Sequence, residues 1–206
     1  MRRVASHPQH RPPRHNRLGP LVAATIVVAV AAMLAISQVR AARSSPTPLP
    51  PGMALVLDVI DGDTLALEVS GHRETIRMLG IDTPETHHPT RPVECFGAEA
   101  SARLAELAPP GTVVRLERDD EARDHFGRLL AYVHLPTDDG DVFINHLLVA
   151  EGFAVALPID PNRAHRSSLA AAERAARSAG AGLWGRCGGP GVAIDPLASG
   201  TPTASR

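Results

Sequence analysis

The apolar and polar positions of the chain predict a set of short strands between residues 53 and 135. Five runs are rich in β-branched and aliphatic residues: 53–60, 64–69, 74–81, 112–117 and 129–135. In the second run, Leu65, Leu67 and Val69 alternate with polar or small residues, which is the period of two that a strand requires. A Ser-Gly-His turn leads into the third run, so the first three strands are predicted to form a meander.

Three further stretches follow the helical period instead: 97–107, 141–151 and 163–179. In the first of them Ala100, Leu104 and Leu107 share one stripe, and a Pro-Pro-Gly sequence ends the helix. Gly152 and Gly180 close the other two. Five short strands with helices between them indicate a small barrel of the OB type, although the number of strands alone leaves a β-sandwich open.

The first 39 residues have a different character. Residues 1–20 are basic and hold five arginines, and the segment 21–39 that follows is an almost unbroken apolar run as far as residue 36. A positive flank before an apolar run keeps the N-terminus in the cytoplasm. The run is short for a transmembrane helix and long for a signal peptide. A retained membrane anchor and a cleaved signal both stay open, and both place the rest of the chain outside the cytoplasm.

Composition divides the rest of the chain into a linker, one domain and a tail. Residues 40–52 are rich in Pro and Ser and predict a stiff linker, because proline fixes the backbone and removes a hydrogen-bond donor. Residues 53–187 form the predicted domain. With 44% apolar but only 3% aromatic residues in the chain, its core must be mainly aliphatic. Residues 188–206 show no period and predict a disordered tail.

The two cysteines of the chain, Cys95 and Cys187, flank the first and last predicted helices of the domain. Because an exported domain meets oxidising conditions, we expect them to form a disulfide. Closing so long a loop contributes about 4 to 5 kcal/mol in the chain-entropy account. Two free thiols are the alternative, whereas two sulfur ligands without suitably spaced histidines do not make a zinc site.

The charge balance limits how a polyanion could bind. The first 41 residues contain six arginines and no acidic residue, which leaves 15 basic against 22 acidic residues and a net charge of about -7 for the remainder. Such a domain repels nucleic acid at long range. Any phosphate binding must therefore be local, through a few arginines and a metal ion.

Two acidic clusters are candidates for that local chemistry. Asp61 and Asp63 flank a glycine, and the alternation of an extended chain puts both on one side. A hard cation between them and a third acid would relieve their repulsion, although a polar β-turn explains the same pattern. Asp82, Thr83 and Glu85 follow the third strand, where the proline after Thr83 stiffens the backbone. A turn or helix cap is the alternative there.

Two arginines are candidates for phosphate binding. Arg77 lies within an apolar strand, and Arg128 ends the sequence D-H-F-G-R. An arginine among apolar residues requires an anionic partner, and a phosphate would accept two hydrogen bonds from its planar fork. A structural salt bridge to Asp or Glu would satisfy each arginine equally well.

Taken in order, these segments resemble the staphylococcal nuclease-like (thermonuclease) domain. The resemblance covers about Met53–Trp184 and rests on V-I-D-G-D-T, I-R-M-L-G-I-D-T-P-E, F-G-A-E-A, D-H-F-G-R-L-L-A-Y and a last helix that runs to L-W. It implies an OB-fold, a five-stranded barrel with three α-helices. It also implies a calcium-dependent endonuclease that hydrolyses DNA or RNA to 3'-phosphate products and acts as a monomer.

The resemblance also implies roles for seven residues: Asp63, Asp82 and the Thr83 carbonyl as Ca²⁺ ligands, Asp61 supporting them, Glu85 as general base, and Arg77 and Arg128 as phosphate-binding groups. Elementary chemistry agrees with these roles. Attack on a phosphodiester builds negative charge that two guanidinium groups and a divalent cation stabilise. The attacking water needs a nearby proton acceptor, which is typically worth about 10² to 10⁴ in rate.

The chain departs from the family pattern where tyrosines usually pack on the nucleotide base. Residues 155–160 carry no aromatic side chain, with one residue fewer than usual, and Phe126 stands where a tyrosine is common. Base stacking is worth about 1 to 3 kcal/mol, so weaker substrate affinity is expected. A non-catalytic binding module on the same barrel, for nucleic acid or protein, is the main alternative, and a structural domain at the cell surface is another. The retained acids and arginines favour catalysis.

Overall fold

A computed structural model describes residues 33, 49–86 and 92–194 of the chain. The chain divides into two units, residues 1–47 and residues 48–206. Met33 is the one described residue of the first unit, so the predicted apolar segment and its basic flank otherwise lie outside the described residues. Within the described part, none of the helices is long and apolar enough to cross a membrane. All the other described residues belong to the second unit.

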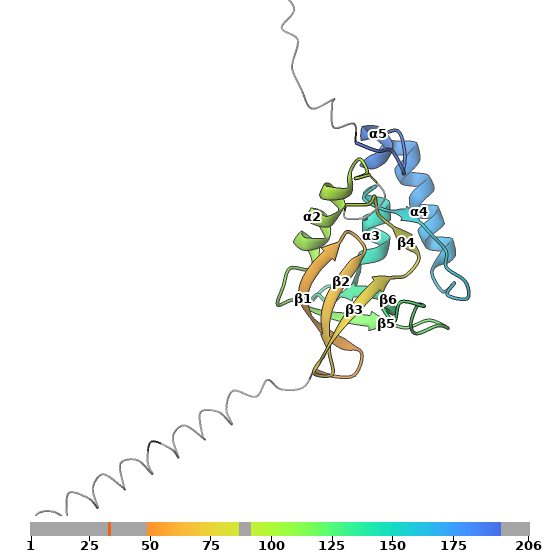
Figure 1. Cartoon of the computed structure of the whole chain (residues 1–206). Coiled ribbons are helices and arrows are strands. Elements are labelled where there is room, and N and C mark those ends of the chain that lie inside the picture. The colour runs from red at the N-terminus through yellow and green to blue at the C-terminus, as the bar shows by residue number, and fades with distance from the viewer. Residues whose placement is uncertain (1–32, 34–48, 87–91, 195–206) are drawn as a thin grey trace, which may run out of the picture. The chain divides into compact units, whose positions relative to one another are not determined.

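Five strands of this second unit close into a barrel (Figure 1). They are β1 (Met53–Asp61), β2 (Thr64–Val69), β3 (His72–Met78), β5 (Val113–Glu117) and β6 (Leu129–Leu135). The hydrogen-bonded order is β3-β2-β1-β5-β6, and β3 also pairs with β6 in parallel register. This last pairing makes the sheet a barrel rather than a sandwich. The expected five-stranded barrel is therefore confirmed, as is the meander of its first three strands.

Aliphatic side chains fill the barrel, as the low aromatic content predicts. Leu65, Leu67, Ile76 and Val133 are fully buried, and Tyr132 is the largest side chain in this core. Burying an aliphatic side chain of this size is worth about 1.5 to 3 kcal/mol relative to exposure. The barrel thus has a core without needing ligands in its interior.

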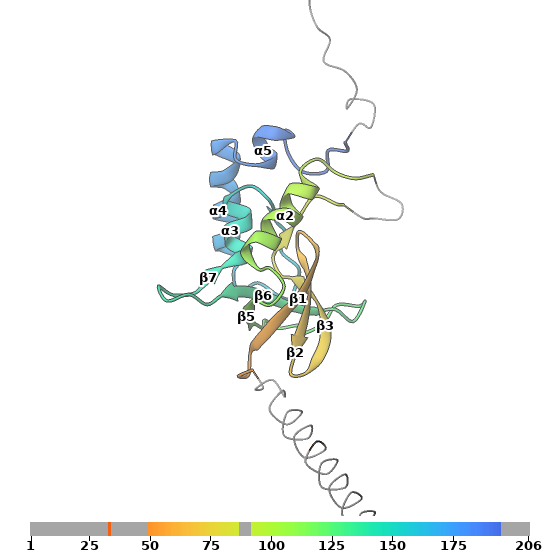
Figure 2. The ribbon, with the colours of Figure 1, turned by 90° about the vertical axis from the view of Figure 1, so that its left-hand side faces the viewer.

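The helices gather at one end of the barrel. They are α2 (Gly97–Leu107), α3 (Ile144–Ala150), α4 (Arg166–Ala179) and the short α5 (Leu183–Arg186). Two views at right angles place them towards the end opposite the β2–β3 turn (Figures 1 and 2). The β1–β2 turn and the end of β3 lie at this same end, and these are the segments that carry the predicted acids.

Three elements differ from the sequence-based expectation. The third predicted strand is divided, because Gly80 adopts a φ of +75° that bends the chain; a separate strand β4 (Ile81–Asp82) then pairs with β8 (Val155–Ala156). The first residues of the second predicted helix instead form β7 (Val142–Phe143), which pairs with β6. The third helix begins at Arg166 rather than at residue 163. In each case a contact distant in sequence overrides the local pattern.

The folded unit also extends beyond its predicted C-terminal limit. The expected disulfide between Cys95 and Cys187 is present, with the two Cα atoms 6.0 Å apart. Composition predicts a disordered tail for residues 188–194, but 192–194 pair with residues 93–95: the Cys95 N–H donates to the Val192 carbonyl at 2.7 Å. The bridge and this pairing hold a Gly-rich segment whose own sequence has no structural preference. Residues 195–206 lie outside the described residues.

Asn145 joins α3 to the barrel. Its side chain is fully buried, its Nδ2 donates to the Leu79 carbonyl at 2.8 Å, and its Oδ1 accepts from the Val133 N–H at 2.9 Å. The Leu79 carbonyl belongs to the bend that separates β3 from β4. One side chain therefore fixes the helix against both the barrel and the bend.

We expect Asn145→Ala to lower the free energy of unfolding by about 3 kcal/mol, because it leaves two buried backbone groups without hydrogen bonds. Urea titration would measure this loss. Asn145→Leu keeps most of the volume and removes only the polar contacts, so it should be destabilised to a similar degree. Wild-type stability of the leucine variant would show that the hydrogen bonds are unimportant.

Glu117 lies between two histidines on the helix side of the barrel. His134 Nε2 contacts one of its carboxylate oxygens and His165 Nε2 the other, both at 2.8 Å. Burial alone would raise the pKa of Glu117, but the hydrogen bonds and charges of His165 and His134 lower it overall. Burial, together with the charge of Arg115, lowers the pKa of His134 below its ordinary value of 6.5, against the opposing influence of Glu117.

We predict that acidification from about pH 7.5 to 5.5 destabilises the fold through His134. In the unfolded chain His134 takes up a proton near the ordinary histidine pKa, whereas in the folded chain it binds the proton less readily. Acid therefore favours the unfolded chain, and stability is lost as the pH falls through that value. His134→Gln should flatten the dependence of the melting temperature on pH over this range. His72→Gln, on the exposed β2–β3 hairpin, is the control and should retain the wild-type slope; an unchanged slope in His134→Gln would contradict the argument.

Candidate active site

A tight turn brings the two predicted acidic clusters into contact. The β1–β2 register is irregular between Val59 and Asp61, just before the turn at Gly62. A Cβ atom on Gly62 would lie 2.8 Å from Thr83 Oγ1 and 3.0 Å from Ala100 Cβ on α2. Only glycine allows so close an approach. The turn that carries Asp61 and Asp63 therefore packs directly against Thr83.

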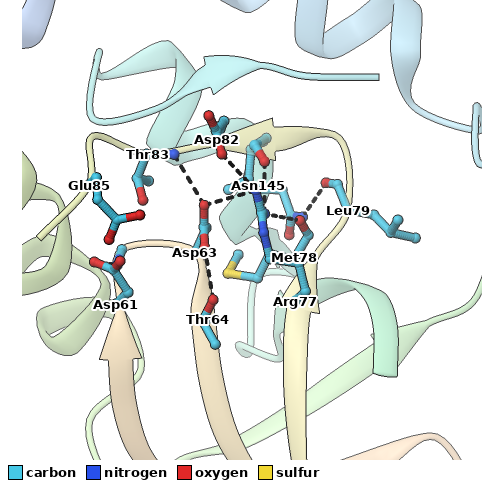
Figure 3. Close-up of polar contacts among 12 residues, drawn as sticks. Asp61, Asp63, Thr64, Arg77, Met78, Leu79, Asp82, Thr83, Glu85 and Asn145 are labelled. Carbon is cyan, nitrogen blue, oxygen red and sulfur yellow. Dashed lines mark hydrogen bonds and ion pairs between the residues drawn. The ribbon is translucent and has the colours of Figure 1, made fainter. Parts of the chain in front are cut away.

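Asp63 is the buried centre of this cluster, with a relative exposure of 6%. Its Oδ1 accepts a hydrogen bond from the Thr64 hydroxyl at 2.9 Å, and its Oδ2 accepts one from the Thr83 N–H at 3.2 Å. The same Oδ2 lies 3.1 Å from Arg77 Nη2 (Figure 3). Burial of a carboxylate requires such partners, so the position of Asp63 depends on β3 and on the segment after β4.

Arg77 links three segments of the chain. Its Nη1 donates to the carbonyls of Met78 at 2.8 Å and Ile81 at 2.9 Å, and its Nη2 contacts Asp82 Oδ1 at 2.8 Å as well as Asp63. The structural ion pair that the sequence left open is thus present, within the cluster itself. Nη1 is held by the backbone, and none of the described residues accepts a hydrogen bond from Nε. The guanidinium is therefore fixed in place beside the two acids that it contacts.

Asp61 supports the segment that carries Glu85. Its Oδ1 accepts hydrogen bonds from the Gly62 N–H at 2.8 Å, the Thr86 hydroxyl at 2.9 Å and the Ser101 hydroxyl at 3.0 Å. These contacts join the β1–β2 turn to α2 and to the residue after Glu85. In Figure 3 the side chain of Glu85 extends towards the ends of β1 and β2, where Asp61 and Asp63 lie.

Arg128 is held by a carboxylate that the sequence analysis did not assign a role. Asp124 Oδ2 accepts from Arg128 Nε at 2.7 Å, and Asp124 Oδ1 accepts from the backbone N–H groups of Phe126 and Arg128. Burial would raise the pKa of Asp124, but the hydrogen bonds and charge of Arg128 lower it overall. An Asp placed four residues before Arg with a Gly between them is the sequence signal that could have indicated this loop.

Barrel closure then places Arg128 beside the cluster. In the parallel β3–β6 ladder, Ile76 pairs with Leu129 and Arg77 with Leu130. Arg128 directly precedes these residues of β6, so it stands level with Thr75 of β3, which lines the same pocket as the acids. Its guanidinium lies 5.5 Å from the ring centroid of Phe126, whose relative exposure is 73%.

All seven predicted site residues line one open pocket of about 720 Å³: Asp61, Asp63, Arg77, Asp82, Thr83, Glu85 and Arg128. Thr64, Thr75, Glu94, Ile60 and Phe126 complete its lining. Both arginines therefore face the same space as the acids. Glu94 is a further acid at this pocket that sequence reasoning missed, because it belongs to none of the recognised clusters.

The donor chemistry of the pocket fits a hard divalent cation. Within the described ranges, no group of three or more His, Cys, Asp or Glu side chains is arranged to hold a metal ion. Two carboxylates, Asp63 and the half-exposed Asp82, line the pocket together with Thr83. Oxygen donors of this kind, with further positions left to water or substrate, suit Ca²⁺ and do not suit a metal that prefers nitrogen or sulfur.

A second hollow of about 330 Å³ shares Arg77 and Arg128 with the active-site pocket. Ile159, Leu130 and His125 contribute to its lining. Ile159 comes from residues 155–160, the stretch without aromatic side chains. The lining is otherwise mainly charged, with Glu121 and Asp124 beside the arginines, so Ile159 and Leu130 are its two aliphatic residues.

Comparison with known proteins agrees with this geometry. The family described as staphylococcal nuclease homologue matches residues 75–186. The thermonuclease of Staphylococcus intermedius is 39% identical over 132 residues, which cover 64% of this chain and 76% of that protein. The thermonuclease of Staphylococcus hyicus is 37% identical over 129 residues, or 63% and 73% of the two chains.

A relative from another genus has a similar likeness. Endonuclease YncB of Bacillus subtilis (strain 168) is 38% identical over 131 residues, which cover 63% of this chain and 60% of that protein. The matched lengths agree with the extent of the barrel and its helices. The family match spans more than half of the chain, and the two thermonucleases are covered over more than two thirds of their length. The chain therefore belongs to the staphylococcal nuclease family.

Proposed function

We propose that this nuclease hydrolyses phosphodiester bonds of DNA or RNA with the help of Ca²⁺, outside the cytoplasm, and leaves 3'-phosphate ends. The observation that carries the proposal is the single pocket that Asp63, Asp82, Glu85, Arg77 and Arg128 all line. Acids alone would suit a cation site, and arginines alone would suit an anion site. Their combination suits a phosphate that is attacked beside a cation.

In this proposal Asp63, Asp82 and the Thr83 carbonyl hold Ca²⁺, and Asp61 keeps their turn in place. The cation supplies charge for the phosphate oxygens and lowers the cost of activating water. Glu85 accepts the proton from the attacking water. Its segment is tied to α2 and to the β1–β2 turn through the contacts of Asp61, which favours one fixed orientation of the general base.

The two arginines contribute differently because they are held differently. Nη1 of Arg77 is engaged by two backbone carbonyls and Nη2 by Asp63 and Asp82, so this group is rigid and close to the cation ligands. Arg128 is held through Nε by Asp124, which leaves its terminal nitrogens as donors to a phosphate. Charge-assisted donors fixed before the reaction stabilise the developing charge without reorganisation.

The setting outside the cytoplasm rests on the N-terminal sequence, as a membrane-anchored or a secreted protein. The Cys95–Cys187 disulfide supports it, since such bridges persist in oxidising compartments. We further propose that the chain acts as a monomer, because one chain supplies every group that lines the pocket. Because the net negative charge repels nucleic acid at long range, the substrate must be bound by these local groups.

Purified protein should degrade DNA when Ca²⁺ is added and stop when a chelator removes it.

Glu85→Gln should fold normally and lose about 10² to 10⁴ in turnover, the usual worth of a general base. Glu99→Gln, an exposed substitution on α2, is the matched control and should keep full activity. Digestion at equal rates by wild type and Glu85→Gln would refute the assigned base.

Arg128→Lys should reduce kcat/KM by about 10² to 10³, the usual cost of removing a fixed donor at a developing charge. Lysine keeps the charge but lacks the planar fork and the Nε contact to Asp124. Arg123→Lys lies in the same loop, where Arg123 pairs with Glu74 at the surface, and should leave the rate unchanged. Steady-state kinetics of the three proteins test this, and equal losses in both variants would count against a specific role for Arg128.

A further inference from the structure

The segment after α5 folds back onto the loop that carries Glu85. We call residues 187–194 the C-terminal strap. The family match ends at residue 186, so the strap is an addition beyond the matched region. Its first residue forms the disulfide with Cys95, and its last three residues pair with residues 93–95.

Three contacts join the strap to residues 93–95. The Cys95 N–H donates to the Val192 carbonyl at 2.7 Å, and the Ile194 N–H donates to the Val93 carbonyl at 2.9 Å. Between them, Glu94 and Ala193 form an antiparallel bridge. Together with the disulfide, these contacts fix the backbone of residues 93–95 from one side.

Glu94 connects this fixed segment to Glu85 through two hydrogen bonds. The Glu94 N–H donates to the Glu85 carbonyl at 2.8 Å, and the Glu85 N–H donates to Glu94 Oε2 at 3.2 Å. The backbone of the proposed general base is thus held by one residue through both its donor and its acceptor. The same Glu94 also lines the active-site pocket.

The strap also lies beside the proposed cation ligands. The lining of a hollow of about 300 Å³ includes Asp82 and Thr83, Glu94, and Pro190 and Gly191 of the strap. The start of α2 closes in as well, since a Cβ atom on Gly97 would lie 3.2 Å from the Glu85 carbonyl oxygen. The backbone at Glu85 is therefore held between α2 and the segment that the strap braces.

We propose that the strap positions Glu85 through Glu94, and that turnover by this nuclease therefore depends on the Cys95–Cys187 disulfide. The inference rests on the proposed role of Glu85 as general base. A displacement of about 1 Å in a catalytic group can cost about 10²-fold in rate. A dithiol reductant supplies two electrons and two protons, giving two cysteine thiols and the oxidised, cyclic reductant. The strap then loses its covalent attachment and retains only backbone hydrogen bonds.

The test uses the full-length chain, with kcat and KM measured well below the melting temperature. Dithiothreitol should lower kcat by about tenfold to a hundredfold and leave KM within about twofold. The double variant Cys95→Ser, Cys187→Ser should show the same loss without reductant and no further response to it. A kcat unaffected by reduction, as measured on protein whose thiols have been counted, would overturn the proposal even if the melting temperature fell.

Glu94 gives a second arm that leaves the disulfide intact. Glu94→Gln retains an oxygen acceptor for the Glu85 N–H and should keep kcat near wild type, whereas Glu94→Ala should lose about tenfold or more. A role in stability alone would lower the melting temperature of the alanine variant without this change in kcat. Equal kcat in the two Glu94 variants would overturn positioning through Glu94.

Combining the variants separates the two proposals. In a Glu85→Gln background, removing the disulfide should cost less than about threefold, because the group that it positions is already lost. Full additivity of the two losses would overturn the proposed route through Glu85. If Glu85→Gln itself kept wild-type turnover, the assignment of the base would fail, and positioning of that base would fail with it, whatever the strap variants showed.

Discussion

The contact of Arg77 with Asp63, a buried pair, and with the half-exposed Asp82 is the interaction on which the candidate active site depends. It joins β2, β3 and the segment after β3 at one end of the barrel. Removing one partner from such a buried pair typically costs about 3 to 5 kcal/mol, because the other charge stays behind without compensation. The pair is therefore a structural joint and, in the proposed mechanism, also part of the cation site.

Local pattern predicted most of the barrel because each strand and helix carries its own periodicity. Residues 64–69, 97–107 and 129–135 have the predicted bounds in the structure. The pattern failed where a distant partner decides the conformation. Gly80 bends the chain so that Ile81 can pair with β8, and Val142 pairs with β6 instead of starting a helix. The local sequence does not indicate either pairing.

The same distinction holds for the candidate site. The acids and arginines were identified from the sequence because their segments have a recognisable order, and the structure brings all of them to one pocket. Asp124 and Glu94 were missed because their importance lies in what they hold, the guanidinium of Arg128 and the backbone of Glu85. The strap was missed because a Gly-rich sequence predicts disorder, whereas a distant cysteine fixes its position.

The parallel pairing of β3 with β6 has a consequence for when the protein can act. The two strands are separated by two other strands and a helix along the chain, so their contact is among those that form at a high cost in loop entropy. This contact, together with the ion pair of Arg123 with Glu74, brings Arg128 to the acids. A chain whose barrel is still open therefore carries the proposed cation ligands without both of the proposed phosphate-binding arginines in place. Such a chain would cleave nucleic acid more slowly, by about the 10² to 10³ expected for loss of a fixed donor, until its last strands meet.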